Sequence, residues 1–174
     1  MPRISGELLK ELNKQIQEEI YSAYLYYSMA AWFDSENLPG FAHWLKLQAM
    51  EELTHAHRFY RHIVDRLNEV ELLEIAKPPS KWSSPLNAFE EAFKHEEHIT
   101  ARIQFLMELA GKEGDHSAVV GVLQWFVTEQ IEEETQFDAV VAKLRMAGDN
   151  KGALYVLDRE MATRTFTWPP DLEI

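Results

Sequence analysis

The 174-residue chain has no cysteine, no long apolar run and comparatively few basic residues. The absence of cysteine excludes disulfides, thiolate-bound zinc, iron–sulfur clusters and thiol nucleophiles. Because it has neither a run of eighteen apolar residues nor an N-terminal segment of signal-peptide type, we expect a cytoplasmic protein with no membrane contact. The 17 lysine and arginine residues are outnumbered by 29 aspartate and glutamate residues, which gives a net charge of −12. Such a surface repels nucleic acid and attracts cations, so no nucleic-acid partner is expected.

Turn-forming residues gather in four segments: DSENLPG (34–40), KPPSKWSSP (77–85), GKEGD (111–115) and AGDNKG (147–152). The stretches of roughly 25 to 30 residues between them lack proline and are too long for strands. We therefore predict an all-α fold, an antiparallel four-helix bundle with a long crossover between helices two and three plus a short fifth helix. The predicted helices are about 6–34, 39–67, 85–112, 115–146 and 150–161, the crossover is 68–84, and residues 1–174 form a single domain.

Each of the four long predicted helices carries a glutamate in the middle of its inward seam. Alternating steps of three and four residues pass through apolar residues at both ends of each helix and through Glu19, Glu52, Glu96 and Glu133 near the centre. Glu19 lies 17 positions before the turn near residue 36, and Glu52 lies 16 positions after it. In the second hairpin, Glu96 and Glu133 lie 18 and 19 positions from the turn near residue 114. At about 1.5 Å per residue, the four carboxylates are expected at one level of the bundle.

Four buried carboxylates need positive charge nearby. An isolated carboxylate in an apolar interior costs several kcal/mol, and four in one layer also repel each other. No lysine or arginine occupies the central seam positions, whereas two divalent cations balance four negative charges. His55 lies three residues after Glu52 on the same helical face, so both side chains can reach one metal, and Glu52 can bridge two. Carboxylates with one imidazole suit iron, manganese or zinc.

Known ferritin-like di-iron bundles have a single Glu on two helices and Glu-x-x-His on the other two. This chain has one complete motif, residues 52–55, and carries Gln136 where the second histidine would stand. One metal would therefore have an all-oxygen set of ligands and be held more loosely. The segments EEIYSAYLYYSMA, LQAMEELTHAHRF, FKHEEHITARI and LQWFVTEQIEEE resemble the helix motifs of prokaryotic non-haem ferritins, and the resemblance covers essentially the whole chain.

This resemblance implies a ferroxidase centre that oxidises Fe(II) with O2 or H2O2, and a homo-24-mer shell that stores the ferric mineral. It assigns Glu19, Glu52 and His55 to the first iron, and Glu52, Glu96 and Glu133 to the second. Gln130 and Tyr26 are expected beside these two ions. A possible third iron would be bound by Glu51, Glu129 and Glu132. Haem is not expected, because Leu53 stands where bacterioferritins carry a haem-ligating methionine.

Other interpretations stay open at this point. Tyr26 also fits a core tyrosine whose hydroxyl is hydrogen-bonded. Glu51, Glu129 and Glu132 also fit solvated glutamates beside the seam. For the whole protein, one alternative is a di-iron oxidoreductase or peroxidase that retains its metals while it acts on another substrate. Another is a helical interaction module that binds no metal.

Overall fold

The computed structural model describes residues 3–172, and every regular element within that range is helical. The four long helices are α1 (Gly6–Ser35), α2 (Pro39–Asp65), α3 (Pro85–Lys112) and α5 (Gln124–Ala147), and α6 (Lys151–Met161) is shorter. Three short elements complete the set: α4 (His116–Ala118), the π-helix η1 (Val119–Leu123) and the 3₁₀ helix η2 (Pro170–Leu172). This is the predicted all-α bundle. No helix among the described residues is long and apolar enough to cross a membrane.

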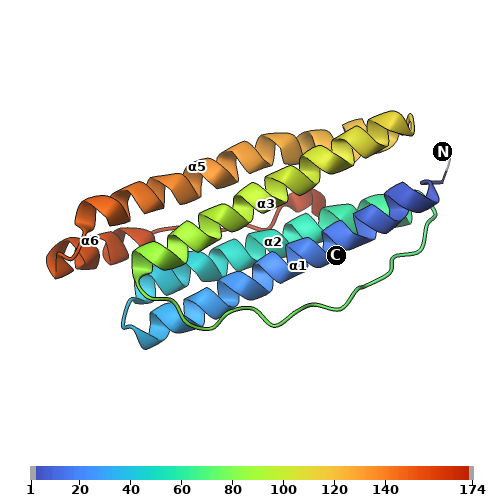
Figure 1. Cartoon of the computed structure of the whole chain (residues 1–174). Coiled ribbons are helices and arrows are strands. Elements are labelled where there is room, and N and C mark those ends of the chain that lie inside the picture. The colour runs from blue at the N-terminus through green and yellow to red at the C-terminus, as the bar shows by residue number, and fades with distance from the viewer. Residues whose placement is uncertain (1–2, 173–174) are drawn as a thin grey trace.

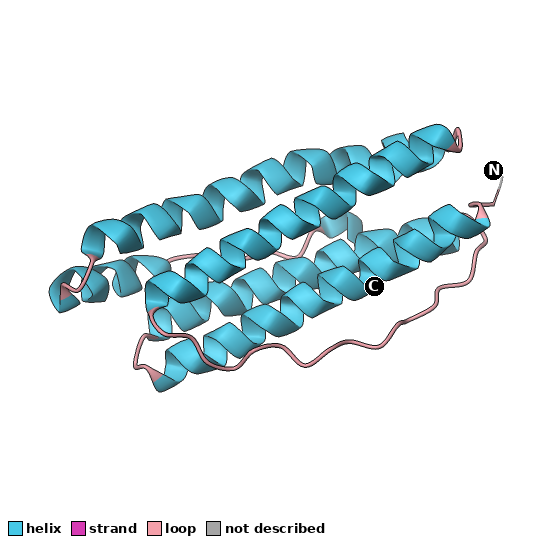
Figure 2. Cartoon of the chain, viewed as in Figure 1, coloured by secondary structure: helices cyan, strands magenta, loops and turns pink. Residues whose placement is uncertain are grey.

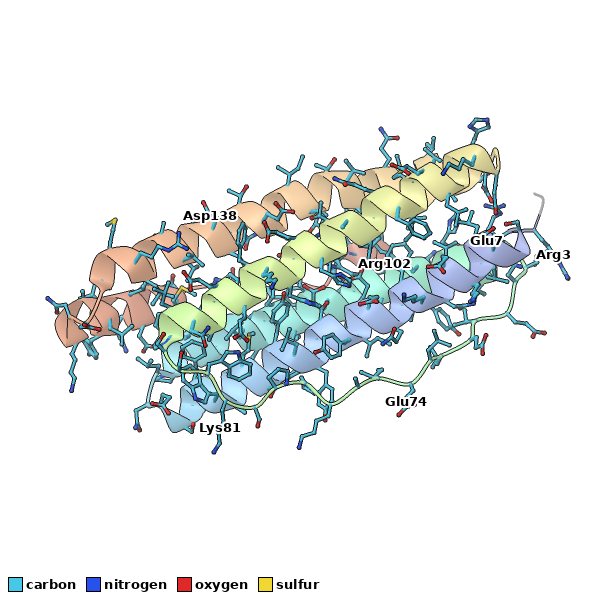
Figure 3. The ribbon with its side chains drawn as sticks, viewed as in Figure 1. Arg3, Glu7, Glu74, Lys81, Arg102 and Asp138 are labelled. Atoms are coloured by element: carbon cyan, nitrogen blue, oxygen red, sulfur yellow. The ribbon has the colours of Figure 1, made fainter. Side chains whose placement is uncertain are left out.

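The bundle consists of two antiparallel hairpins, α1 with α2 and α3 with α5 (Figure 1). The segment between α2 and α3 runs along the length of the bundle beside α1, so α2 and α3 are parallel (Figure 2). Two hydrogen bonds fasten this crossover to α1: Glu71 N donates to Asn13 Oδ1 at 3.0 Å, and Ser28 Oγ donates to the Pro79 carbonyl at 2.5 Å. Its charged side chains Glu74 and Lys81 point away from the bundle (Figure 3).

Two apolar clusters fill the bundle, one toward each end. One cluster includes Phe33, Phe41 and Phe89, whose rings pack at centroid distances of 5.1 to 5.7 Å. The other includes Phe59 and Phe126, which stack at 4.3 Å. Burial of one such side chain stabilises the fold by about 1.5–3 kcal/mol. Each long helix contributes residues to both clusters. The middle of each helix therefore has an apolar, low-dielectric interior above it and below it along the bundle.

The predicted fourth helix, 115–146, is not continuous. The chain forms one turn of α-helix at α4, then the π-helix η1, and regular α-helix resumes at Gln124. A π-helical turn places one extra residue per turn and shifts the following side chains around the axis. Gly121 lies in this turn beside the His62 ring, 3.7 Å from where a Cβ would stand. Periodicity alone does not reveal such an insertion, because the seam positions from Leu123 onward follow the ordinary α-helical spacing.

The second predicted helix, 39–67, also ends earlier than expected. It stops at Asp65, because Leu67 adopts a left-handed backbone conformation with φ of 57°. At its other end, the N-cap Leu38 provides no side-chain hydrogen bond. Asp158 of α6 takes that role, since its Oδ1 accepts from Gly40 N at 2.8 Å and from Phe41 N at 3.0 Å. A Cβ on Gly40 would lie 1.7 Å from the Asp158 carbonyl oxygen, so this docking requires glycine.

Candidate metal centre

The predicted seam residues meet in one layer between the two apolar clusters. Glu19 lies between Ile16 of one cluster and Ala23 of the other, and the seam glutamate of each other long helix likewise lies between the two clusters. The side chains of this layer are 2% exposed or less: Glu19, Glu52, His55, Glu96 and Glu133. The level of each carboxylate follows from its distance in sequence to the nearest turn.

These five side chains and the partly exposed Glu129 form three groups, and within each group the ligand atoms lie within 4.8 Å of one another. They are Glu19 with Glu52 and His55, Glu52 with Glu96 and Glu133, and His55 with Glu129 and Glu133. The first two groups are the same sets that the resemblance assigned to two metals, and Glu52 belongs to both. A carboxylate has two oxygens, so Glu52 has one ligand atom for each of two adjacent cations.

Side-chain amides donate to these carboxylates. Gln15 Nε2 donates to Glu19 Oε1 at 2.9 Å, and Gln48 Nε2 donates both to Glu52 Oε1 at 2.9 Å and to Glu133 Oε2 at 2.7 Å. The sequence reasoning missed Gln15 and Gln48 as functional residues. A signal was present, because each lies four residues before a seam glutamate on the same helical face.

Glu96 accepts hydrogen bonds from two residues that the resemblance to non-haem ferritins placed beside the centre. Tyr26 donates its hydroxyl to Glu96 Oε1. Gln130 Nε2 lies 3.3 Å from Glu96 Oε2 and equally far from Thr100 Oγ1. Tyr26 therefore has a satisfied hydroxyl, as a core tyrosine requires, and it also touches a candidate ligand.

Burial favours the protonated form of three glutamates of this layer. It raises the pKa of Glu19 to about 8, and repulsion from Glu52 adds to the effect. The pKa of Glu96 is raised to about 8 for the same two reasons, and that of Glu133 is raised as well. Burial lowers the pKa of His55, but attraction to Glu52 and contacts with Glu129 and Glu52 outweigh it, so the net direction is upward.

One atom of the layer has no hydrogen-bond partner among the described residues: Glu19 Oε2, which is fully buried. A buried carboxylate oxygen without a partner is costly unless a cation or water binds there. The donor set, carboxylate oxygens with one imidazole, suits hard and borderline divalent cations. The residues of the layer thus fit divalent cations such as those of iron, manganese or zinc.

The residues predicted for a third iron do not form one group here. Glu129 Oε1 lies 3.6 Å from His55 Nε2 and joins that residue and Glu133. Glu51 forms an ion pair with Arg164 instead. Glu132 is exposed and accepts a hydrogen bond from Gln136 at 3.1 Å. A third site therefore remains a prediction, and it requires these carboxylates to change partners.

Comparison with known proteins decides the family. The family model described as a ferritin-like domain matches residues 9–147. The chain belongs to the ferritin family. The bacterial non-heme ferritin of Staphylococcus aureus (strain MRSA252) is 37% identical over 163 residues, which are 94% of this chain and 98% of that protein. The counterpart from Staphylococcus saprophyticus is also 37% identical, with 94% and 97% covered.

Solved ferritin structures are similar over the same extent. An open pore ferritin from the hyperthermophilic archaeon Archaeoglobus fulgidus is 46% identical, with a TM-score of 0.92 over 93% of this chain and 98% of that one. A closed form of the same ferritin, engineered by site-directed mutagenesis, has the same identity and TM-score over 94% and 99%. The four-helix bundle of this ferritin was thus predicted correctly from its sequence.

Proposed function

We propose that this ferritin stores and detoxifies iron, oxidising Fe(II) at the buried layer and holding the ferric product inside a shell made of copies of the chain. The observation that carries the proposal is the pair of ligand groups that share Glu52 inside the water-excluded bundle. The arginines nearest to this layer pair with other carboxylates, Arg102 with Glu11 and Arg164 with Glu51. Two iron ions supply the positive charge that the carboxylates lack.

In this proposal iron is the substrate. Glu19, Glu52 and His55 bind one Fe(II), and Glu52, Glu96 and Glu133 bind the other. Each Fe(II) gives up one electron. The two electrons, with two protons, reduce O2 to H2O2 or reduce H2O2 to two waters. The raised pKa values of Glu19 and Glu96 mean that metal binding itself frees protons inside the site.

Two hydrogen-bond donors lie beside the second group. The amide of Gln130 and the hydroxyl of Tyr26 both donate to Glu96. Burial and the surrounding carboxylates raise the pKa of Tyr26 well above its usual value, so its hydroxyl keeps its proton. We assign these residues to the orientation of Glu96 and of the oxidant. Glu51, Glu129 and Glu132 are assigned to a third iron site through which ferric ions leave.

Assembly into a homo-24-mer is part of the proposal, as is a cytoplasmic location. Tyr24 and Tyr27 on α1, Leu53 and Tyr60 on α2, and Leu72 on the crossover are all at least 40% exposed in the single chain. Exposed aromatic and aliphatic side chains gathered along neighbouring elements are typical of subunit interfaces. Haem is not part of the proposed cofactor set.

The deciding experiment is aerobic loading of metal-free protein with Fe(II) far above two ions per chain, followed by sizing of the particles and measurement of the iron they retain. Storage predicts a particle of about twenty-four chains that keeps a large excess of iron in solution. Precipitation of all iron beyond two ions per chain would favour the alternative of a di-iron oxidoreductase with resident metals. Failure to take up stoichiometric Fe(II) without oxygen would favour a metal-free interaction module.

A matched pair of variants tests the site assignment. Glu52→Ala removes a ligand from both metals, so rapid Fe(II) oxidation is expected to be abolished. Glu97→Ala makes the same chemical change at an exposed position of α3, beside the candidate ligand Glu96, and is expected to oxidise Fe(II) at the unaltered rate. Equal rates in the two variants contradict the assignment.

A further inference from the structure

The glutamines that donate to the candidate ligands are themselves held by arginines. Arg164 lies after α6, in the C-terminal segment, and its Nη1 donates to Gln48 Oε1 at 2.7 Å. Arg102 reaches from α3 toward α1 (Figure 3), and its Nε donates to Gln15 Oε1 at 3.3 Å. Each arginine therefore binds the carbonyl end of an amide whose NH2 end faces a metal-binding carboxylate.

We propose that Arg102 and Arg164 are positioning residues of the metal centre, acting through two Arg–Gln–Glu triads. The α1 triad is Arg102, Gln15 and Glu19, and the α2 triad is Arg164, Gln48 and Glu52. The inference rests on the proposed metal centre. It adds to that centre two residues, Arg102 and Arg164, that act on the ligands of the two metals only through a glutamine.

The physical basis is the two-ended chemistry of an amide. A glutamine side chain presents an acceptor at one end and two donors at the other, and rotation by half a turn exchanges them. Arginine only donates, so it fixes Gln48 with its oxygen turned toward Arg164 and its NH2 turned toward the layer. Without Arg164, the Gln48 amide can rotate and turn its oxygen toward Glu52 and Glu133. The two hydrogen bonds that its NH2 donates to these carboxylates would then be lost.

Both arginines are held in place by further contacts. The Arg164 guanidinium lies 4.2 Å above the Trp44 ring and forms an ion pair with Glu51. The Arg164 carbonyl accepts from His43 Nε2 at 3.0 Å, which fixes the backbone there.

On the other side of the bundle, Arg102 forms an ion pair with Glu11 at 3.0 Å. The side chains of Arg102 and Arg164 are only 12% and 14% exposed, so neither is a freely moving surface residue.

The two triads are expected to support different numbers of metals. Glu19 belongs only to the group with Glu52 and His55, so the α1 triad supports one metal. Gln48 donates to Glu52, which both groups share, and to Glu133 of the other group. The α2 triad therefore supports both metals. A general loss of stability does not produce this difference between two sites.

The test is titration of the intact, metal-free protein with Co(II), whose visible absorption reports ligand geometry without any oxidation. Replacement of residues that orient metal ligands typically costs about 10–100-fold in affinity. Arg102→Gln is expected to weaken one of two bound Co(II) ions by about that factor and to leave the other unchanged. Arg164→Gln is expected to weaken both and to alter both spectra.

Arg159→Gln is the matched control, because Arg159 is exposed on α6 and takes part in neither triad. A double-mutant cycle adds a second readout. Because Arg164 acts through Gln48, the Arg164→Gln change is expected to cost little more affinity once Gln48→Met is present.

Several results would overturn the inference. One is that Arg102→Gln and Arg164→Gln bind Co(II) with the same affinities and spectra as Arg159→Gln. Another is that the losses of Co(II) affinity caused by Arg164→Gln and by Gln48→Met add fully in the double variant. If Arg164→Gln does not fold, Arg164→Lys takes its place: one ammonium cannot hold Gln48 and Glu51 as the guanidinium does, so wild-type Co(II) binding would refute the proposal. A wild-type protein that binds no Co(II) contradicts the proposed metal centre itself, whatever the variants do.

Discussion

Metal binding to the buried layer is expected to release protons, and the number can be worked out from the structure. Burial raises the pKa of Glu19 and of Glu96 to about 8. A carboxyl with that pKa is about 90% protonated at pH 7 and about 25% protonated at pH 8.5. Divalent cations bind the ionised form. Filling both groups therefore releases about two protons per chain from these two residues at pH 7 and about half a proton at pH 8.5.

The pKa values of Glu133 and His55 are raised too, so protons released from these residues add to this number. The measurement is calorimetric titration with Co(II) in several buffers of different ionisation enthalpy, which separates buffer heat from binding heat. Glu19→Gln cannot titrate at that position and is expected to release about one proton fewer. If fewer than one proton is released at pH 7, the carboxylates are already ionised without metal, and the argument from burial fails.

Two further predictions concern stability without metal. Because the pKa of Glu19 is raised, the folded protein binds more protons than the unfolded chain between pH 4.5 and about 8, so its free energy of unfolding is expected to fall as pH rises through that window. Thermal unfolding with a chelator present measures this change. An unfolding midpoint that rises steadily with pH across the window would contradict the prediction. Gly40→Ala places a methyl group against the Asp158 carbonyl and is expected to cost at least about 1–3 kcal/mol, seen as a lower midpoint, whereas Gly111→Ala, with open space around its Cβ position, is expected to leave the midpoint nearly unchanged.

The features of the fold and of the candidate site that the sequence predicted are those that follow from the regular repeat of the α-helix. Glu19, Glu52, Glu96 and Glu133 were found because a seam repeats every three to four residues and because the distance from a turn sets the height along the bundle. His55 followed from its spacing to Glu52. The membership of the ferritin family agrees with this pattern.

The parts that escaped prediction depend on contacts distant in sequence or on irregular backbone. Arg164 meets Gln48 across 116 residues, and Arg102 meets Gln15 across 87. Arg164 stands in an irregular segment, where no repeat indicates which way a side chain points. The π-helix η1 left no trace in the residue types either, since an insertion of one residue changes hydrogen bonding and leaves composition unaltered.

The unequal composition of the two ligand groups gives a physical reason to expect iron to pass through the site. One group contains His55, and the other has only carboxylates because Gln136 stands where a histidine would complete a second Glu-x-x-His motif. Gln136 donates to the exposed Glu132 and so is turned away from the buried layer. An imidazole ligand strengthens the binding of a borderline metal such as Fe(II), whereas Fe(III) is harder and prefers carboxylate oxygens. Fe(II) is therefore expected to bind more weakly in the all-carboxylate group than in the group with His55. Glu129 and Glu51, at the edge of the layer, offer an Fe(III) product further carboxylate oxygens of the kind that it prefers.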